Sequence, residues 1–199
     1  MPDVYAVDPQ CPDRTIIAKA AHIVKNGGLV IFPTETVYGI GALYGDMQAK
    51  QKLFTAKKRP LDKPITIHIS HLKYIEQVGC SIPDCARRYI ADYWPGPVTL
   101  LLPMHTGNGK LGFRLPDHPV ALALIDASGG LMLATSANKS GGKSPVTAQE
   151  AQEQLGDNAD AIIDAGQTGY LGDSIIVDCS AEQPVVIREG VINQSKFVL

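Results

Sequence analysis

The stretch LVIFPTETVYGIG, residues 29–41, decides the fold that the sequence predicts. Its first part, Leu29–Phe32, is a short apolar run closed by a proline, which is typical of a buried β-strand. The polar part that follows, Pro33–Gly41, is predicted to be a loop. Because open α/β sheets bind their ligands beyond strand ends, this loop is a candidate wall of a binding site.

Helical and strand patterns alternate on both sides of this stretch. Apolar side chains at helical spacing predict helices that start after Asp13, at Met47, near Pro83, after Asp117 and after Thr147. Asp13 and Asp117 are predicted N-caps, and the pairs Ser81/Asp84 and Thr147/Glu150 have the spacing of capping boxes. Further strands are predicted at residues 65–69, 98–102, 111–115, 131–135, 174–178 and 185–188.

This alternation contains neither a Pro/Ser-rich linker nor an internal repeat, so we predict one α/β domain over residues 1–199. The strands at 98–102 and 111–115 are joined by a short glycine-rich link, which suits an antiparallel pair. The sheet is therefore predicted to be mixed, with helices on its faces.

Composition excludes several classes of protein. The chain has 199 residues, of which 45% are hydrophobic and 19% charged, so it can build a core and is not a disordered tail. Its net charge of −2 excludes a protein that coats nucleic acid by bulk charge. We expect no membrane partner, because no apolar run approaches about 20 residues.

The cysteines and histidines form no recognisable metal pattern. Four cysteines are scattered without a CxxC pair, and five histidines include no HExxH. We therefore predict no metal ligands and four reduced thiols, as expected in the cytoplasm. The start of the chain has no basic residue before Arg14, so no signal peptide is predicted and the expected location is cytoplasmic.

Positive charge is concentrated in one segment. Residues 50–63 contain six basic side chains and one acidic side chain, Asp62. This run creates a local positive field in a chain that is slightly negative. Pro60 and Pro64 stiffen the end of the run and restrict the directions of the neighbouring basic side chains.

Two segments resemble nucleotide-binding loops only superficially. After Gly39 and Gly41, Tyr44 stands where a dinucleotide-binding GxGxxG motif needs its third glycine. The segment Gly142–Ser144 resembles the end of a P-loop, but Ala137 occupies the position of the first glycine. A nucleotide would therefore be bound by another architecture. The predicted strand ends carry cationic side chains, hydroxyl groups and glycine-rich backbone. Together these suit a polyanionic ligand beside a small hydrogen-bonding group. A triphosphate and an amino acid are one such pair of ligands.

Five motifs, in this order along the chain, resemble the YrdC-like threonylcarbamoyl-AMP synthase family. They are Phe32–Gly39, Lys57–Pro60, Trp94–Thr99, Ser136–Gly141 and Arg188–Gly190, and the resemblance covers roughly residues 15–190. It implies a twisted mixed β-sheet flanked by helices, with a deep positively charged cavity. It also implies a nucleotidyltransferase that forms threonylcarbamoyl-AMP and pyrophosphate from L-threonine, bicarbonate and ATP, for tRNA modification.

The resemblance also implies roles for individual residues. The catalytic motifs are KxR and SxN, at Lys57, Arg59, Ser136 and Asn138. The implied ATP-binding residues are Arg59, Lys63, Lys110, Ser136, Ser144 and Arg188. The implied threonine-binding residues are Thr36, His68, Arg114, Ala134 and Ser174. Mg²⁺ is expected with the substrate ATP, held mainly by phosphates and water.

Two departures from the family pattern give further expectations. Relatives read Ser-Thr-Ile-Val-Asp where this chain has Ile175 after Ser174, so we expect one hydroxyl to be lost from the cavity wall. Some relatives carry a second domain, and this chain resembles the short form without it, so any contribution of that domain is expected to be absent or supplied by partners.

Three points stay open at this level. The chain could be an RNA-binding module of the same fold, with the basic run 50–63 contacting phosphates, or an enzyme that forms another carbamoyl adenylate. Direct contact with tRNA or double-stranded RNA is undecided. The downstream tRNA-modifying proteins are expected as partners but are not identified.

Overall fold

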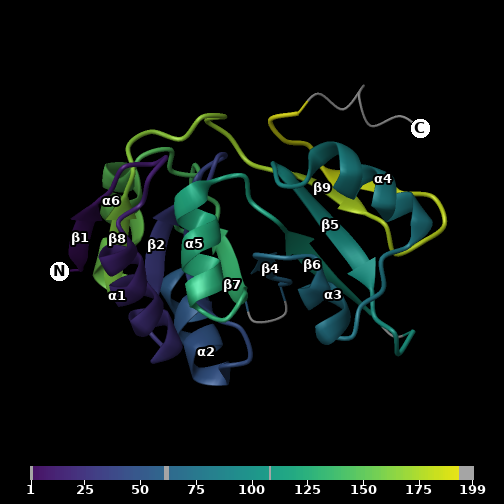
Figure 1. The fold of residues 1–199 in the computed structure, drawn as a ribbon, viewed down its shortest axis with the longest axis horizontal. Helices are drawn as coiled ribbons and strands as arrows, with labels where there is room; N and C mark the ends of the chain where they lie inside the picture. Colours follow the sequence, from purple (N-terminus) through teal and green to yellow (C-terminus); the bar gives the residue numbers. More distant parts are fainter. Residues whose placement is uncertain (1, 61–62, 108, 193–199) are drawn as a thin grey trace.

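The computed structural model describes residues 2–60, 63–107 and 109–192, in which helices cover a mixed β-sheet (Figure 1). The helices are α1 (Arg14–Lys25), α2 (Met47–Ala56), α3 (Lys73–Gln77), α4 (Asp84–Tyr93), α5 (Pro119–Ala127), α6 (Ala148–Leu155) and the 3-10 helix η1 (Gly156–Asn158). The strands are β1 (Asp3–Ala6), β2 (Val30–Pro33), β3 (Tyr38–Leu43), β4 (Thr66–Ile69), β5 (Val98–Pro103), β6 (Lys110–Arg114), β7 (Leu131–Ser136), β8 (Ala161–Asp164), β9 (Ile175–Asp178) and β10 (Val185–Arg188). No helix in these ranges is both long and apolar enough to cross a bilayer.

Within the described residues, ten strands form one sheet in the order β1-β8-β2-β3-β7-β4-β6-β5-β9-β10. The pairs β1/β8, β2/β8, β4/β6 and β5/β9 are parallel, and the other neighbours are antiparallel. The prediction of a mixed sheet is therefore confirmed, as is the antiparallel pairing of β5 with β6. The sheet is twisted, since β2 and β5 cross the view at different angles (Figure 1).

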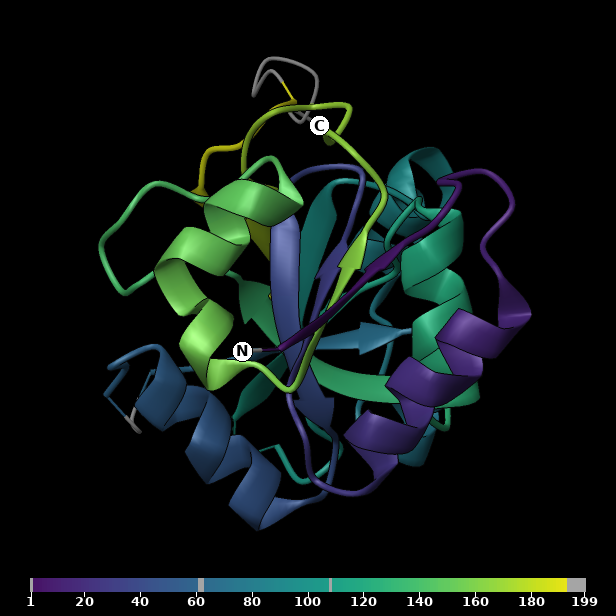
Figure 2. The same ribbon diagram turned by 90° about the vertical axis from the view of Figure 1, so that its left-hand side faces the viewer.

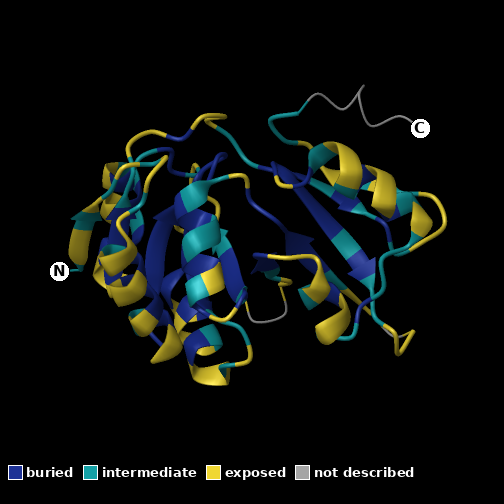
Figure 3. Ribbon diagram, viewed as in Figure 1, coloured by how far each residue is buried: buried dark blue, intermediate teal, exposed yellow. Residues whose placement is uncertain are grey.

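Helices cover both faces of the half of the sheet that contains β1, β8, β2, β3 and β7. Figure 2 shows α1 and α5 on one face and α2 and α6 on the other. Apolar side chains of α1 and α5 pack with alternate residues of β2, β7 and β8, such as Phe32 and Met132. The larger cluster on the opposite face includes Ile67, Leu100 and Phe113. The central strands are buried, whereas the edge strands β1 and β10 are mostly exposed, as are the outer sides of the helices and many loops (Figure 3).

The second half of the sheet is covered differently on its two faces. Helices α3 and α4 contribute to the larger cluster, together with the inward residues of β4, β5, β6 and β9. The alternate residues of the same strands, including Thr66 and His68 of β4, point to the other face because successive strand side chains alternate. That face forms the floor of a cavity.

The prediction that residues 33–41 form a loop is wrong for its second half. Strand β3 starts at Tyr38 and pairs antiparallel with β2, with Gly39 opposite Phe32 and Gly41 opposite Val30. The glycines weaken a strand pattern in sequence, but tertiary packing requires a glycine at position 41. A Cβ at Gly41 would lie 2.6 Å from the Cε of Met132 and 2.9 Å from a ring carbon of Phe32.

The helices fall where the sequence predicts them, but two predicted caps are wrong. Helix α4 starts after Pro83 and has no side-chain cap, so Ser81 and Asp84 form no capping box. The N-cap of α5 is His118 rather than Asp117, because Pro119 occupies the first helical position and the cap directly precedes it. The N-cap at Asp13 is confirmed, with its carboxylate accepting hydrogen bonds from two backbone N–H groups of α1.

Four short elements had no sequence prediction. Strands β1 and β8 have four residues each, α3 has five and η1 has three. Windows of this length carry too few positions to establish a periodicity. Strand β1 is also mostly exposed, so it lacks the apolar alternation of a half-buried strand.

Candidate active site

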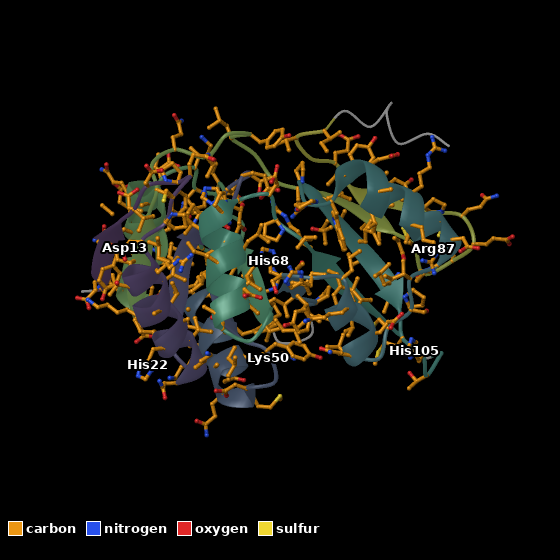
Figure 4. The ribbon with its side chains drawn as sticks, in the orientation of Figure 1. Asp13, His22, Lys50, His68, Arg87 and His105 are labelled. Carbon is orange, nitrogen blue, oxygen red and sulfur yellow. The ribbon has the colours of Figure 1, made fainter. Side chains whose placement is uncertain are left out.

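One cavity, of about 280 Å³, brings together chain segments from Thr34 to Arg188. Its floor consists of outward residues of β4, β6, β5 and β9, and its walls come from strand ends and loops. The lining residues are Thr34, Val37, Gly39, Lys57, Arg59, Pro64, Ile65, Thr66, His68, Thr99, Leu101, Gly112, Arg114, Ala134, Thr135, Ser136, Asn138, Ser140, Gly141, Asp173, Ser174, Ile176, Ile187 and Arg188. Figure 4 shows His68 near the middle of the molecule, with His22, Arg87 and His105 at its periphery.

Lys57 holds the loop that follows β7. The side chain is 2% exposed, and its Nζ donates to the backbone oxygens of Ser136 and, at 2.8 Å, Asn138. A third contact reaches Oδ1 of Asn138 at 3.4 Å. An ammonium group has three hydrogens, so these carbonyl oxygens account for all of them. Burial, and next the charge of Arg59, lower the pKa of Lys57 to about 8.

The SxN loop is tied together by its own side chains. The hydroxyl of Ser136 donates to Oδ1 of Asn138 at 2.5 Å. The amide nitrogen of Asn138 donates to the carbonyl oxygens of Lys139 and Gly142, at 3.0 and 2.7 Å. The loop therefore keeps a fixed shape beside the cavity, with Ser136, Asn138 and Ser140 in its lining.

Two further arginines, Arg59 and Arg188, line the cavity. Arg59 donates from Nη2 to the backbone oxygen of Pro64 at 2.7 Å, and its Nε is buried with no partner among the described residues. Arg188 donates from Nη2 to the backbone oxygen of Ser174 at 2.7 Å. Burial lowers the pKa of both guanidinium groups, which are still cations at neutral pH. Unmatched cationic donors in a cavity suit an anionic ligand.

Arg114 is the buried cation of the cavity floor. Its Nη2 donates to Oε1 of Glu35 at 2.9 Å and to the hydroxyl of Thr36 at 2.6 Å. Its Nε and the Oε2 of Glu35 are both buried without a partner among the described residues. Unmatched buried groups of this kind are costly, so their presence beside a cavity indicates a function.

His68 lies next to Arg114 in the parallel pair β4/β6. Its ring meets that of Phe32 edge to face, with centroids 6.2 Å apart, and its Nδ1 has no partner within the described part of the chain. Burial, followed by the charge of Arg114, lowers the pKa of His68 well below its usual range. The imidazole is therefore neutral at physiological pH.

The structure brings most of the predicted site residues into this cavity. The lining contains Lys57, Arg59, His68, Arg114, Ala134, Ser136, Asn138, Ser174 and Arg188. Thr36 is not in the lining but lies fully buried behind Arg114. Its hydroxyl oxygen accepts a hydrogen bond from the guanidinium of Arg114. The roles assigned to these residues stay predictions.

Three predicted ATP-binding residues lie outside the lining. Lys63 is exposed, and Lys110 forms an ion pair with Asp178. The hydroxyl of Ser144 donates to Oδ1 of Asp173 at 2.8 Å, which places it behind a lining residue. Contact of Lys110 with a ligand in the cavity requires that its ion pair with Asp178 opens.

The expected loss of a wall hydroxyl at position 175 is wrong. Ile175 is fully buried in the core cluster on the opposite face of the sheet, and it is not among the lining residues. Ser174 and Ile176, on either side of it, line the cavity instead. Alternation along β9 explains this, since neighbouring strand residues point to opposite faces.

Several polar residues of the site had no individual role in the sequence prediction, among them Glu35, Asp173 and Thr99. Glu35 pairs with Arg114, Asp173 lines the cavity beside Ser144, and Thr99 contacts Ser174. Glu35 and Thr99 stand inside the quoted motifs, so their position was visible, but their burial was not. Asp173 directly precedes a predicted strand, which was its only signal.

Comparison with known proteins gives the family. The family model Sua5_yciO_yrdC, described as "Telomere recombination", matches residues 22–190. This chain belongs to the Sua5/YciO/YrdC family. The sequence prediction of the family and of the mixed α/β fold is thereby confirmed.

Individual members of the Sua5/YciO/YrdC family resemble this chain over most of its length. It is 37% identical over 199 residues to threonylcarbamoyl-AMP synthase of Bacillus subtilis (strain 168), covering 96% of this chain and 56% of that protein. It is 38% identical over 179 residues to threonylcarbamoyl-AMP synthase of Pyrococcus abyssi, covering 86% of this chain and 53% of that protein. The chain thus spans about half the length of these two curated relatives.

Solved structures of the Sua5/YciO/YrdC family have the same fold. The crystal structure of P. abyssi Sua5 complexed with L-threonine matches with a TM-score of 0.91 and 35% identity, over 98% of this chain and 59% of that one. The crystal structure of Escherichia coli YciO matches with a TM-score of 0.87 and 25% identity, over the full length of both chains.

Proposed function

We propose that this protein is an L-threonylcarbamoyladenylate synthase, which forms threonylcarbamoyl-AMP and pyrophosphate from L-threonine, bicarbonate and ATP. The observation that carries the proposal is the cavity that gathers Lys57, Arg59, Arg114 and Arg188 around the SxN loop. Relatives named threonylcarbamoyl-AMP synthase, at 37 and 38% identity, support it. A P. abyssi relative was crystallised with L-threonine, which supports the amino-acid substrate.

Arg114 is proposed to hold the threonine carboxylate. The side chain lines the cavity, and within the described residues only its Nη2 is occupied, by Glu35 and Thr36, so a ligand carboxylate there would meet the remaining face of the guanidinium. Glu35 and Thr36 occupy Nη2 and keep the guanidinium in place. We assign the rest of the threonine side to Thr36, His68, Ala134 and Ser174, of which all but Thr36 line the cavity.

The ATP phosphates are proposed to contact the other side of the cavity. Arg59 and Arg188 supply charge there, and Ser136 supplies a hydroxyl beside the loop that Lys57 and Asn138 hold. We keep Lys63, Lys110 and Ser144 as ATP-binding residues in this proposal, since bound ATP would extend beyond the lining towards these residues. This arrangement requires Lys110 to leave Asp178.

The proposed reaction joins two anions. The threonine amine takes up CO₂ derived from bicarbonate, and water is released. An oxygen of the resulting carbamate then attacks the α-phosphorus of ATP, and the bond to the departing pyrophosphate breaks. Charge repulsion and lost freedom oppose this step. Positioning supplies about 7–11 kcal/mol in such reactions, and each well-aimed donor about 3–4 kcal/mol.

Mg²⁺ is proposed to accompany ATP rather than to occupy a protein cage. The described residues contain no cluster of three or more metal-ligating side chains. Asp173 is the carboxylate in the cavity lining, and one of its oxygens already accepts a hydrogen bond from Ser144. Such a donor set fits a cation held by phosphates and water, which would neutralise the charge of the leaving pyrophosphate.

The structure gives less support to an RNA-binding module. Lys57 and Arg59, two of the six basic residues in the run 50–63, line the cavity rather than forming an outer patch. Direct contact with tRNA or double-stranded RNA therefore rests on exposed members such as Lys52 and Lys58. We propose that the labile product passes to tRNA-modifying proteins. We also propose a cytoplasmic location, which agrees with the four free cysteines.

The proposed function is tested by pyrophosphate release from the purified chain, ATP and bicarbonate, with each amino acid added in turn. We expect release that requires bicarbonate and threonine together, and a loss of about tenfold or more in Arg59→Ala. ATP turnover that ignores threonine contradicts the proposal. Release with a different amino acid identifies another carbamoyl adenylate, and binding of RNA without any turnover, weakening steeply with salt, favours the RNA-binding module.

A further inference from the structure

Two hydroxyl groups meet on the floor of the cavity. The side chains of Thr99 on β5 and Ser174 at the start of β9 are 3% and 4% exposed, and both line the cavity. Their oxygens lie 3.1 Å apart, within hydrogen-bond distance. The parallel register of β5 and β9, with Val98 opposite Ile175, keeps the two residues on neighbouring strands.

Arg188 donates a hydrogen bond to one member of this hydroxyl pair. Its Nη2 donates to the Ser174 hydroxyl oxygen at 3.1 Å, so one lone pair of that oxygen is occupied. Neither hydroxyl has another protein partner within the described residues. If Thr99 donates to Ser174, the Ser174 hydrogen stays free. If Ser174 donates to Thr99, the Thr99 hydrogen stays free.

Both arrangements leave the same hydrogen-bonding groups free for a ligand. The pair keeps one donor hydrogen and two lone pairs, because a hydroxyl carries one hydrogen and two lone pairs. A carboxylate can only accept hydrogen bonds and an ammonium can only donate them, so neither can use both the free hydrogen and the free lone pairs. A ligand hydroxyl donates and accepts, and it therefore matches the pair.

The position of the pair fits an amino acid held at Arg114. Strands β5 and β6 are antiparallel with Leu100 opposite Phe113, which brings Thr99 and Arg114 to adjacent strands on the cavity face. Neighbouring strands lie about 4.8 Å apart. The charge of Arg114 also acts on Arg188, whose Nη2 contacts the Ser174 hydroxyl, so the guanidinium of Arg114 and the hydroxyl pair lie in the same region of the cavity. Leu101 and Ile176 add apolar surface nearby for a methyl group.

We propose that Thr99 is a specificity-determining residue, which with Ser174 forms a subsite for the side-chain hydroxyl of a β-hydroxy amino acid. This inference rests on the proposed function, in which Arg114 holds the carboxylate. It adds the reason why threonine would be chosen over an amino acid of the same size without a hydroxyl. Such an analogue leaves the buried hydroxyl pair unmatched.

The test compares L-threonine with L-2-aminobutyrate, which has the same carbon skeleton and no hydroxyl. The variant Thr99→Val keeps the shape of the side chain and removes its hydroxyl, and Thr99→Ser keeps the hydroxyl. The quantity measured is kcat/KM from pyrophosphate release. Ser128→Ala is a matched control, because Ser128 is a buried hydroxyl outside the cavity with no partner among the described residues.

We expect the wild type to favour threonine by about 100-fold or more. Thr99→Val should lose about tenfold or more of this preference through a lower kcat/KM for threonine, with 2-aminobutyrate nearly unaffected. Thr99→Ser and Ser128→Ala should retain the preference. An equal loss for both substrates in Thr99→Val, or an unchanged preference, overturns the subsite.

Measurements on the wild type distinguish a failure of the proposed function from a failure of the subsite. A wild type that releases no pyrophosphate with threonine contradicts the synthase activity itself, and the subsite with it. A wild type that uses threonine and 2-aminobutyrate equally contradicts the subsite alone. This second comparison needs no variant, so it decides the question even if Thr99→Val does not fold.

Discussion

At the scale of single residues, the site is built from buried charges that are held by specific partners. A buried ion pair such as Arg114 and Glu35 gains little net stability, because the desolvation of both ions offsets their attraction. Removing one partner is different, since it leaves the other charge buried and costs about 3–5 kcal/mol. This asymmetry keeps the Arg114 guanidinium fixed on the cavity floor, where a ligand carboxylate can use the donor that is left over.

Lys57 gives a prediction for pH dependence. Its pKa of about 8 implies that the ammonium loses a proton as the pH rises through 8. A neutral amine has two hydrogens for three carbonyl oxygens, so the SxN loop loses one contact and the rate should fall. We expect the ratio of the wild-type rate to the rate of Lys57→Arg to drop above about pH 8, because an arginine stays charged there. The ratio cancels the titration of the substrate amine.

Stability separates this effect from unfolding. Between about pH 8 and the usual pKa of 10.5, the unfolded chain binds more protons at Lys57 than the folded chain does. The contribution of Lys57 to the free energy of unfolding therefore rises with pH in this window. Thermal melts should show no loss of fold that parallels the loss of rate. A flat rate ratio from pH 7 to 9 contradicts the prediction.

Single residues also show which features of the site can be predicted from the sequence. The motifs predict that Lys57, Arg59, Ser136, Asn138 and Arg188 share one site, and the cavity brings them together. The sequence assigns charge to Lys57 but not the direction of its hydrogens, which are occupied by carbonyls of a segment about 80 positions away. The partner of Lys110 was likewise not predictable, since Asp178 is a long-range neighbour.

At the scale of elements, alternation along four strands separates core from site. Ile67, Phe113 and Leu100 enter the core, while His68, Arg114 and Thr99 face the cavity. The period of two for β4 was visible in the sequence, and with it the side on which His68 lies. The start of β3 was not visible, because Gly39 and Gly41 obscure the strand pattern. Only the folded structure shows that Phe32 and Met132 leave no room for a Cβ at Gly41.

Gly112 on β6 provides a test of the cavity floor. A Cβ at this position would lie 3.1 Å from Cδ2 of Leu101 and 3.8 Å from the hydroxyl of Thr66, both of which line the cavity. Gly112→Val should therefore place methyl groups in the substrate space. We expect pyrophosphate release to fall by roughly a hundredfold, as for a misplaced substrate. The free energy of unfolding should fall by only about 1–3 kcal/mol, the usual cost of overpacking.

The matched control is the smaller substitution at the same position. Gly112→Ala adds one methyl group, so its loss of rate should lie between those of the wild type and Gly112→Val. Chemical denaturation measures the stability of all three proteins under the same conditions. A folded Gly112→Val protein with the wild-type rate would show that the floor of β6 does not contact the substrates.

At the scale of the whole molecule, the site exists only when distant segments are folded together. The lining residues run from Thr34 to Arg188, and they come from both halves of the sheet. The folded state therefore binds the substrates and the unfolded chain does not. By linkage, each substrate should stabilise the entire fold in proportion to its saturation.

This linkage yields a prediction that separates the two sides of the cavity. Threonine at about 100 times its Kd should stabilise the wild type by about 2.7 kcal/mol, which raises the Tm of a chain of this size by about 5–10 °C. Arg114→Gln should lose the shift with threonine and keep the shift with ATP, and Arg59→Gln should do the reverse. Each shift is measured against the variant's own melting temperature, because Arg114→Gln also leaves Glu35 without its ion pair. Equal loss of both shifts in either variant would mean that the arginine supports the cavity as a whole rather than one substrate.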